Sequence, residues 1–306
     1  MLPKLADELK FSAIFRHPMT SGIEMKLTIV NLGLPEFFDR KSDIIYGLFH
    51  ALSSLGHTVS VSHNSLETKT LNILIGSDII SGDTEATLTL QKNRCDYVIY
   101  EVENYNGTTV NYRDNFNLEN YKIILRNAKS IITPYKYNLK ALRATCNDTT
   151  PVHYSKWGFH ESMIRQNIDR SGAFKHNALF FGLIKGTRVN KFNALKERYG
   201  KGVQFIDQTL PFTIRDYFMS DCQFGLSLSY GNTDDFVNPF RIMSMVANGM
   251  PVLADHKIDE DNYLDLCIKY DFSELLNVIE SQNICLASLK EKCRSLNLAD
   301  NLRGIL

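Results

Sequence analysis

The chain has 306 residues, of which 44% are hydrophobic and 22% are charged, and its 34 lysines and arginines equal its 34 aspartates and glutamates. This length allows two globular domains of ordinary size, and the balanced charge excludes a strong overall field that would favour nucleic acid or an anionic membrane. The six cysteines form no CxxC pair or metal-spaced His/Cys cluster, no apolar run approaches the roughly 20 residues of a membrane span, and the N-terminus lacks a signal-peptide layout, so we expect a cytoplasmic protein.

The first half of the chain alternates short apolar runs with stretches of helical periodicity. A strand is expected at 26–32, followed by a helix whose apolar residues recur at helical spacing over 44–55. Ser42 or Asp43 can cap this helix and Gly56 can end it. The further expected elements are strands at 58–61, 71–75, 97–102, 130–133 and 152–154 and helices at 119–127 and 137–144. Strands that alternate with helices indicate a parallel sheet covered on both faces.

The same alternation restarts in the second half of the chain. The expected elements there are strands at 178–181, 203–206, 224–228 and 251–254 and helices at 191–199, 214–220, 261–268, 274–278 and 286–296, with one more helix that begins at Pro239. The expected fold class is therefore α/β, with two doubly wound Rossmann-like domains that face each other across a cleft.

Four parts of the chain follow from this pattern. Residues 1–24, with a short helix and a possible edge strand, are interpreted as an N-terminal extension, and 25–160 as the first domain. The polar stretch 161–177 is interpreted as a linker, and 178–306 as the second domain, whose terminal helix could pack back on the first.

One strand–loop–helix–strand unit, residues 224–255, concentrates candidate binding residues. Its loop contains Tyr230 and Gly231, and Asn238 and Pro239 then precede the helix. The positive end and free N–H groups of a helix N-terminus favour a phosphate, and ligands bind at this edge of a parallel sheet.

Arg241, in the first turn of that helix, distinguishes a binding site from an ordinary polar loop. A cation at a helix N-terminus is slightly unfavourable unless an anion lies between them. Arg241 therefore favours the interpretation as an anion site.

The loop after the strand at 178–181 has similar properties. Gly182 would let a ligand approach the backbone closely, and Lys185 and Arg188 could hold a diphosphate. The alternative is that Lys185 and Arg188 are simply exposed basic residues on a loop between a strand and a helix.

Together these residues resemble the donor site of GT-B glycosyltransferases, most of all the group-1 kind classed with glycosyltransferase family 4. The run PFRIMSMVANGMPV, from Pro239 to Val252, is similar to the family pattern Pro-x-(Lys/Arg)-x-x-Glu-x-x-Ala-x-Gly-x-Pro-Val. The loop with Gly182, Lys185 and Arg188 is similar to the family's phosphate-binding loop, and 157–159 is similar to a segment that ends its acceptor domain. The resemblance extends over residues 25–306 and implies the GT-B fold, with the acceptor on the first domain and a nucleotide sugar on the second.

One position departs from the family pattern. The glutamate that binds the ribose hydroxyls in the family is Ser244 here, and a serine cannot replace a bidentate carboxylate. Either Asp234 or Asp235 holds the ribose, or the donor is unusual, or donor binding has been lost.

Candidate catalytic residues lie in the first domain and at its end. Glu101 and Glu103 follow an apolar strand, where a carboxylate could act as the base for an acceptor hydroxyl. We expect only one of them to face the cleft. His160 would lie near the hinge, although a lone histidine is more often a structural hydrogen-bonding residue.

The resemblance implies a glycosyltransferase that moves a sugar from a nucleotide-diphosphate donor to an acceptor hydroxyl. Lys185, Arg188 and Arg241 would stabilise the leaving diphosphate, and neither a cofactor nor an essential metal is expected. The alternatives are a catalytically silent GT-B-like binding protein, a nucleotide-sugar epimerase, or a transferase that acts on modified DNA bases. The zero net charge argues against a nucleic-acid partner but permits a local basic patch. The donor, the acceptor and the oligomeric state stay open.

Overall fold

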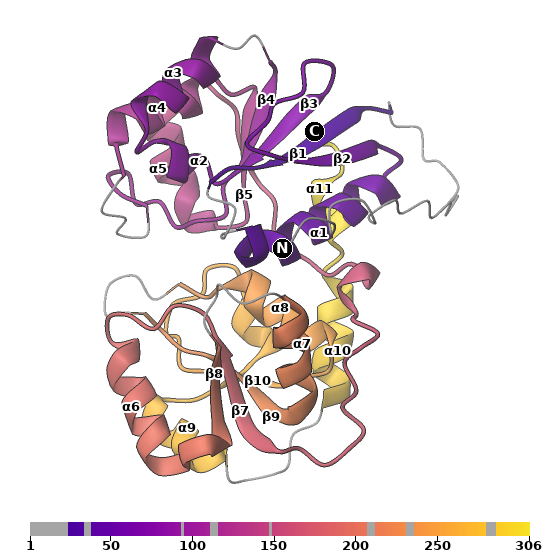
Figure 1. The fold of residues 1–306 in the computed structure, drawn as a ribbon, viewed down its shortest axis with the longest axis vertical. Coiled ribbons are helices and arrows are strands. Elements are labelled where there is room, and N and C mark those ends of the chain that lie inside the picture. Colours follow the sequence, from indigo (N-terminus) through magenta and orange to yellow (C-terminus); the bar gives the residue numbers. More distant parts are fainter. Residues whose placement is uncertain are drawn as a thin grey trace, which may run out of the picture.

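Two parallel β-sheets, each with helices on both faces, form the protein and lie one above the other in Figure 1. The computed structural model describes residues 24–33, 38–92, 95–110, 116–146, 149–206, 212–230, 236–279 and 286–306. The predicted α/β fold with two doubly wound units is confirmed. The short helix and edge strand expected at the N-terminus lie outside the described residues.

The first sheet has the strand order β2-β1-β3-β4-β5-β6, and every pairing is parallel. Its elements are β1 (Lys26–Asn31), α1 (Phe38–Ser54), β2 (Thr58–His63), β3 (Leu71–Ile75), α2 (Ser77–Ile80), α3 (Thr84–Lys92), β4 (Tyr97–Tyr100), α4 (Leu118–Arg126), β5 (Ser130–Thr133), α5 (Lys136–Cys146) and β6 (Val152–Tyr154). Helix α1 covers one face, where Ile29 packs with Leu48, and α3, α4 and α5 cover the other, where Val30 packs with Ile124 (Figure 1).

The second sheet has the order β11-β10-β9-β7-β8 and is also parallel. Its elements are β7 (His176–Phe181), α6 (Arg188–Tyr199), β8 (Val203–Ile206), α7 (Phe212–Asp221), β9 (Cys222–Ser227), α8 (Pro239–Ala247), β10 (Val252–Ala254), β11 (Ile268–Lys269), α9 (Phe272–Val278) and α10 (Leu286–Ser295). The last helix of the chain is α11 (Leu298–Leu302). Helices α6 and α9 cover one face, and α7, α8 and α10 cover the other (Figure 1). Phe180 belongs to the core under α6 and Phe181 to the core under α7, because successive residues of a strand point to opposite faces.

The strand order creates a switch point in each sheet. Strand β1 lies between β2 and β3, and β7 lies between β8 and β9. The loops that follow β7 and β9 therefore run to opposite faces of the second sheet and leave a crevice at its carboxyl edge.

Two local expectations were wrong. A helix was expected at 261–268, but the chain forms a single 3-10 turn, Tyr263–Leu266, followed by β11. Asn262 has a left-handed backbone (φ 58°), and the Asp259 carboxylate accepts the N–H of Leu264, so the geometry is that of a turn. Helix α1 begins at Phe38, so Ser42 and Asp43 lie inside it instead of capping it.

Trp157 lies where the two halves of the molecule meet. Its ring packs edge-on against Tyr100 at the end of β4 and against Phe240 on α8, with ring centroids 6.3 Å and 4.9 Å apart. Its carbonyl also accepts the hydroxyl of Tyr263 at 3.1 Å. One continuous apolar core therefore spans both sheets.

The C-terminal segment returns to the first sheet. Phe159 pairs with Asn297 as an isolated parallel bridge, and the N–H of Leu298 donates to the Phe159 carbonyl at 2.9 Å. Ser155 donates to the carbonyl of Asn301 at 3.0 Å, and α11 packs on α1 (Figure 1). The last residues thus connect the second sheet to the first.

The segment 161–177 is bound along the second sheet's helices. Arg170 donates to the carbonyls of Gly249, Cys222 and Gln223 at 3.1, 2.7 and 2.8 Å. One side chain in this way satisfies carbonyls at the end of α8 and at the start of β9. Within the described residues, no helix is long and apolar enough to cross a membrane.

The return of the C-terminal segment predicts an unusual sensitivity at Gly158. A Cβ there would lie 2.3 Å from the Leu296 carbonyl oxygen and 2.8 Å from the Leu298 nitrogen. We expect Gly158→Ala to lower the free energy of unfolding by about 2–4 kcal/mol in urea titrations, because backbone must move to admit the methyl group. Gly172→Ala is the matched control, since a Cβ there meets nothing within 4 Å. Equal effects of the two substitutions would contradict this account of the packing.

Candidate functional site

Arg241, in the first turn of α8, lies directly against the carboxyl end of β7. The residue that follows β7 is Gly182, with a φ of 141°, and a Cβ on it would come within 2.4 Å of Arg241 Nη2. Glycine at this position therefore admits the guanidinium to the second sheet's switch point.

The Arg241 side chain is buried but incompletely satisfied. The residue is 8% exposed, and its Nε and Nη1 have no hydrogen-bond partner among the described residues. The guanidinium carbon lies 4.8 Å from the centre of the Phe180 ring and 5.7 Å from that of Phe181. Burial, followed by the positive charges of Arg188 and Arg215, lowers the pKa of Arg241 to about 9. A buried cation with unused donors is unfavourable in isolation and favours a bound anion.

Arg188, at the start of α6, reaches the same strand end from the other face of the sheet. Its Nε donates to the Leu228 carbonyl at 2.8 Å and its Nη1 to the Leu183 carbonyl at 3.2 Å. Its guanidinium also lies 5.0 Å from the centre of the Tyr230 ring. Arg188 therefore holds together the loops after β7 and β9 and adds a second positive charge to the crevice.

A buried ion pair, which we did not anticipate from the sequence, supports the loop after β9. Lys191 Nζ lies 2.5 Å from Asp255 Oδ2, and the N–H of Ser229 donates to Asp255 Oδ1 at 2.7 Å. The packing of α6 against the end of β10 brings these two residues together from distant parts of the sequence, so no local motif could reveal the pair.

The other residues predicted for the donor site have the following positions. Asn238 caps α8 by accepting the N–H of Arg241 at 2.9 Å, and Pro239 occupies the first helical position. The side chain of Lys185 is exposed on the loop after β7. Ser244 is half-buried on α8, and its carbonyl accepts the side-chain amide of Asn248 at 2.8 Å. Gly231 lies outside the described residues.

Glu101 is buried at the carboxyl end of β4. Glu101 is 2% exposed. Its carboxylate accepts hydrogen bonds from the Tyr121 hydroxyl, from Ser77 Oγ at 3.2 Å and from the N–H of Glu103 at 2.9 Å. Burial, followed by the nearby charge of Asp78, raises the pKa of Glu101 to about 8. Its side chain is directed toward α2 and α4.

Glu103, two residues further along the chain, is half-exposed. Its charge, after burial, raises the pKa of Tyr135, a residue whose ring packs at right angles to Phe240 with centroids 6.5 Å apart. The two carboxylates have different surroundings because the chain leaves the extended conformation after Tyr100 and bends at Glu103, whereas residues two apart in a continuous strand would share one face.

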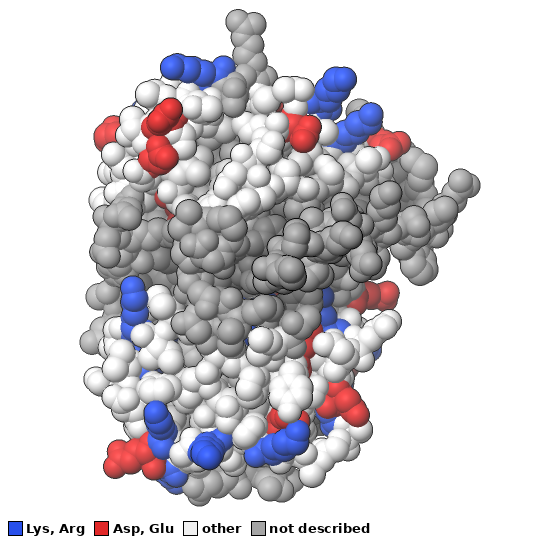
Figure 2. Space-filling view, in the orientation of Figure 1, with Lys and Arg blue, Asp and Glu red and all other residues white. Residues whose placement is uncertain are grey.

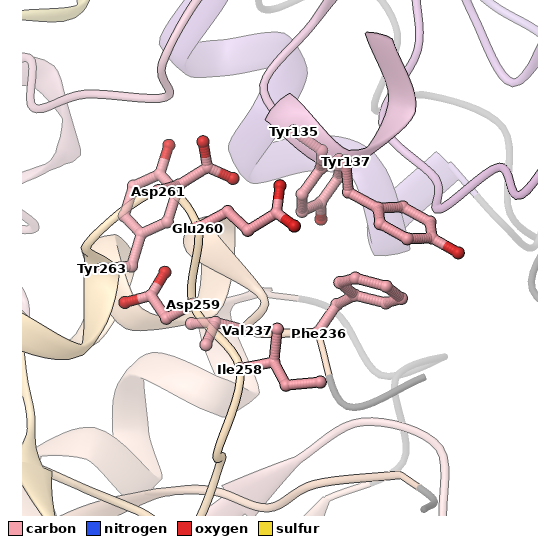
Figure 3. Close-up of a pocket in the computed structure, with 9 residues that line it drawn as sticks. All are labelled: Tyr135, Tyr137, Phe236, Val237, Ile258, Asp259, Glu260, Asp261 and Tyr263. Carbon is pink, nitrogen blue, oxygen red and sulfur yellow. The ribbon is translucent and has the colours of Figure 1, made fainter. Parts of the chain in front are cut away.

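A small pocket lies at that boundary, beside Tyr135 (Figure 3). Tyr135 and Tyr137 enter it from the first half, and the second half supplies the other lining residues: Phe236, Val237, Ile258, Asp259, Glu260, Asp261 and Tyr263. In Figure 3 the Glu260 carboxylate points toward the two tyrosines, and Phe236 lies beneath Tyr137. Within the described part of the chain, no three His, Cys, Asp or Glu residues are grouped so that they could hold a metal ion.

His160 lies against α1. Its Nδ1 is 2.9 Å from Ser162 Oγ and accepts the N–H of Ser162 at 3.1 Å, and its ring stacks on that of His50 with centroids 6.0 Å apart. Burial lowers the pKa of His160. In this position it caps a short 3-10 turn, Glu161–Met163.

Comparison with known proteins identifies the architecture. No protein-family model and no curated protein matches the sequence. A sucrose-phosphate synthase from Thermosynechococcus elongatus aligns over 90% of this chain and 92% of its own, with 13% identity and a TM-score of 0.51. HepE from Anabaena, in complex with UDP and glucose, aligns over 92% of this chain and 94% of its own, with 12% identity and a TM-score of 0.48. The fold assignment rests on the first of these: the chain has the GT-B fold, with two Rossmann-like domains, as the sequence predicts.

The unused donors of Arg241 predict opposite effects on stability and on binding. Arg241→Met should raise the free energy of unfolding of the ligand-free protein by about 1–4 kcal/mol, since it removes a buried charge and retains the side-chain length. The same substitution should abolish anion binding. Arg303→Met, at an exposed ion pair with Asp300, should change stability by less than about 0.5 kcal/mol. Destabilisation by Arg241→Met would show that an internal partner already satisfies the guanidinium.

The raised pKa of Glu101 predicts a dependence of stability on pH. A carboxyl whose folded-state pKa is raised contributes stability below its unfolded value, near 4.5, and that contribution is lost as the pH rises through about 8. Wild type should therefore become progressively less stable than Glu101→Gln, which mimics the protonated acid, between pH 5 and 8, as urea titrations across this range can measure. If the difference in stability between the two proteins stayed constant with pH, Glu101 would not be protonated in the folded protein.

Proposed function

We propose that the protein is a glycosyltransferase that takes a sugar from a nucleotide-diphosphate donor held by the second domain and transfers it to an acceptor hydroxyl. The observation that carries the proposal is Arg241, a buried guanidinium with unused Nε and Nη1 donors, against Gly182 at the sheet's switch point. A diphosphate matches this arrangement because its oxygens can accept from several guanidinium nitrogens at once.

The chemistry of the leaving group explains why cations are needed there. When the bond between sugar and diphosphate breaks, negative charge grows on the diphosphate, and fixed positive groups lower the free energy of that transition state. Arg241 and Arg188 flank the strand end, Lys185 extends from the loop after β7, and α8 directs its N-terminus to the same crevice. In this proposal these groups provide the stabilisation, without a cofactor or an essential metal.

The acceptor would enter from the first domain. We assign the role of general base to Glu103, because it is half-exposed and its charge acts on Tyr135, which lines the pocket in Figure 3. Glu101, which is buried and directed away from the boundary, would support Glu103 by accepting its N–H. His160 would have a structural role as a cap.

The compartment and the class of acceptor follow from more general properties. We assign the protein to the cytoplasm, since the five described free cysteines, four of them buried, suit a reducing environment. We favour a small or saccharide acceptor over nucleic acid, because lysines, arginines and carboxylates are interspersed among the described residues on the face in Figure 2.

A second candidate function rests on Ser244. Without a carboxylate at this position the ribose has a weaker partner, so the protein could bind a nucleotide or a sugar phosphate without turning it over. This candidate keeps the anion site and omits the transfer step.

Calorimetric titration with UDP, GDP and ADP tests the proposal. We expect wild type to bind one of the three, and the Arg188→Ala/Arg241→Ala variant to bind it about 100-fold more weakly or not at all, because a diphosphate then loses two charged partners. The donor-site proposal is wrong if wild type binds none of them.

Turnover then separates the two candidates. Wild type would be incubated with a panel of sugar derivatives of the nucleotide that binds, and slow hydrolysis or transfer would be followed by release of the nucleoside diphosphate. Release that Glu103→Gln reduces supports the enzyme. Tight binding with no release from any member of the panel supports the silent binding protein.

A further inference from the structure

Arg215, on α7, is a third arginine at the end of β7. It is 7% exposed, and its guanidinium carbon lies 5.3 Å from the centre of the Phe181 ring. The Arg241 guanidinium lies 5.7 Å from the centre of the same ring. Because Phe180 and Phe181 point to opposite faces, Arg188 and Arg215 flank Arg241 from opposite sides of the sheet.

Two residues of the first domain hold Arg215 in place. Its Nη1 lies 3.0 Å from Asp43 Oδ2, and its Nη2 donates to Ser42 Oγ at 3.4 Å, both on α1. Its Nε has no hydrogen-bond partner among the described residues, although the side chain is buried. Asp43 and Ser42 thus orient one edge of the Arg215 guanidinium, and its Nε donor stays unused, as do the Nε and Nη1 donors of Arg241.

Asp43 has a second arginine partner that does not reach β7. Arg165 Nη2 lies 3.0 Å from Asp43 Oδ1, but its guanidinium packs 4.6 Å from the centre of the Tyr46 ring on α1. The two ion pairs of Asp43 therefore differ in whether they extend to the crevice. Both join the first domain to later parts of the chain, and only the pair with Arg215 extends to the crevice.

We propose that Arg215 is a phosphate-binding residue of the donor site and that Asp43 is its positioning residue, so that the donor site is complete only when the two domains are in contact. Two buried arginines packed on one aromatic ring repel each other unless an anion lies between them, and each of the two has an unused donor. Asp43 offsets part of this charge and orients Arg215. The inference rests on the proposed function and adds a residue, and a role for the first domain, to the same site.

The test uses inorganic pyrophosphate and the nucleoside diphosphate that wild type binds, both titrated by calorimetry into the full chain. We expect Arg215→Gln to weaken binding about tenfold, the effect of losing one charge-assisted hydrogen bond. Asp43→Asn should weaken it about threefold through loss of orientation, and the double variant should bind no more weakly than Arg215→Gln alone. Arg165→Gln is the matched control, since it breaks the other ion pair of Asp43 and should leave the affinity unchanged.

Each outcome bears on the inference. If Arg215→Gln and Arg165→Gln lower thermal stability similarly and neither changes affinity, Arg215 only joins the domains and the inference fails, while the loss of binding in Arg241→Met still supports the donor site. Tighter binding in Asp43→Asn would also overturn it, because Asp43 would then compete with the phosphate for Arg215. If wild type binds neither probe, the proposed function itself fails. Should Arg215→Gln not fold, Arg215→Lys retains the charge but cannot serve Asp43 and a phosphate together, and it should also weaken binding.

Discussion

The organising constraint of this molecule is a positive charge held out of water at the end of one strand. Arg241 is buried against Gly182, and burial of a guanidinium without an anion opposes folding. Neighbouring residues reduce the cost of burying this charge. The Arg241 guanidinium lies over the rings of Phe180 and Phe181, and Gly182 has no side chain that would clash with it. An anionic ligand would offset the remaining free-energy cost of burying the charge, so the feature that lowers stability would also provide affinity for that ligand.

The contact between the two domains supports this site from outside. Trp157 fills the boundary between Tyr100 and Phe240, the latter being the residue next to Arg241. The C-terminal segment returns to the first sheet through its pairing with Phe159, and Asp43 joins α1 to α7. These contacts make the position of α8 depend on the first domain as well as on its own sheet. If the proposed anion binds at the crevice, these shared residues would couple its binding to the arrangement of the two domains.

Much of the fold could be predicted from the sequence, because strands buried on both faces produce largely apolar runs; the bounds of β3 and β5 match the expected ones. The helix predicted at 261–268 was wrong because the apolar residues of this segment fit a helix, whereas the left-handed Asn262 and the Asp259 cap make it a turn. The role of Arg241 could be predicted, since a cation in the first turn of a helix interacts unfavourably with the helix dipole. The role of Arg215 could not: no local pattern distinguishes this residue, and its importance arises from Phe181 and Asp43, which are distant in sequence.

A crystal structure of the full chain with a bound nucleoside diphosphate would show which groups contact the phosphates. We expect phosphate oxygens within about 3.2 Å of Nε and Nη1 of Arg241, the range of a hydrogen bond, with Gly182 close beneath them. A diphosphate bound elsewhere, with these two nitrogens still without a partner, would contradict it.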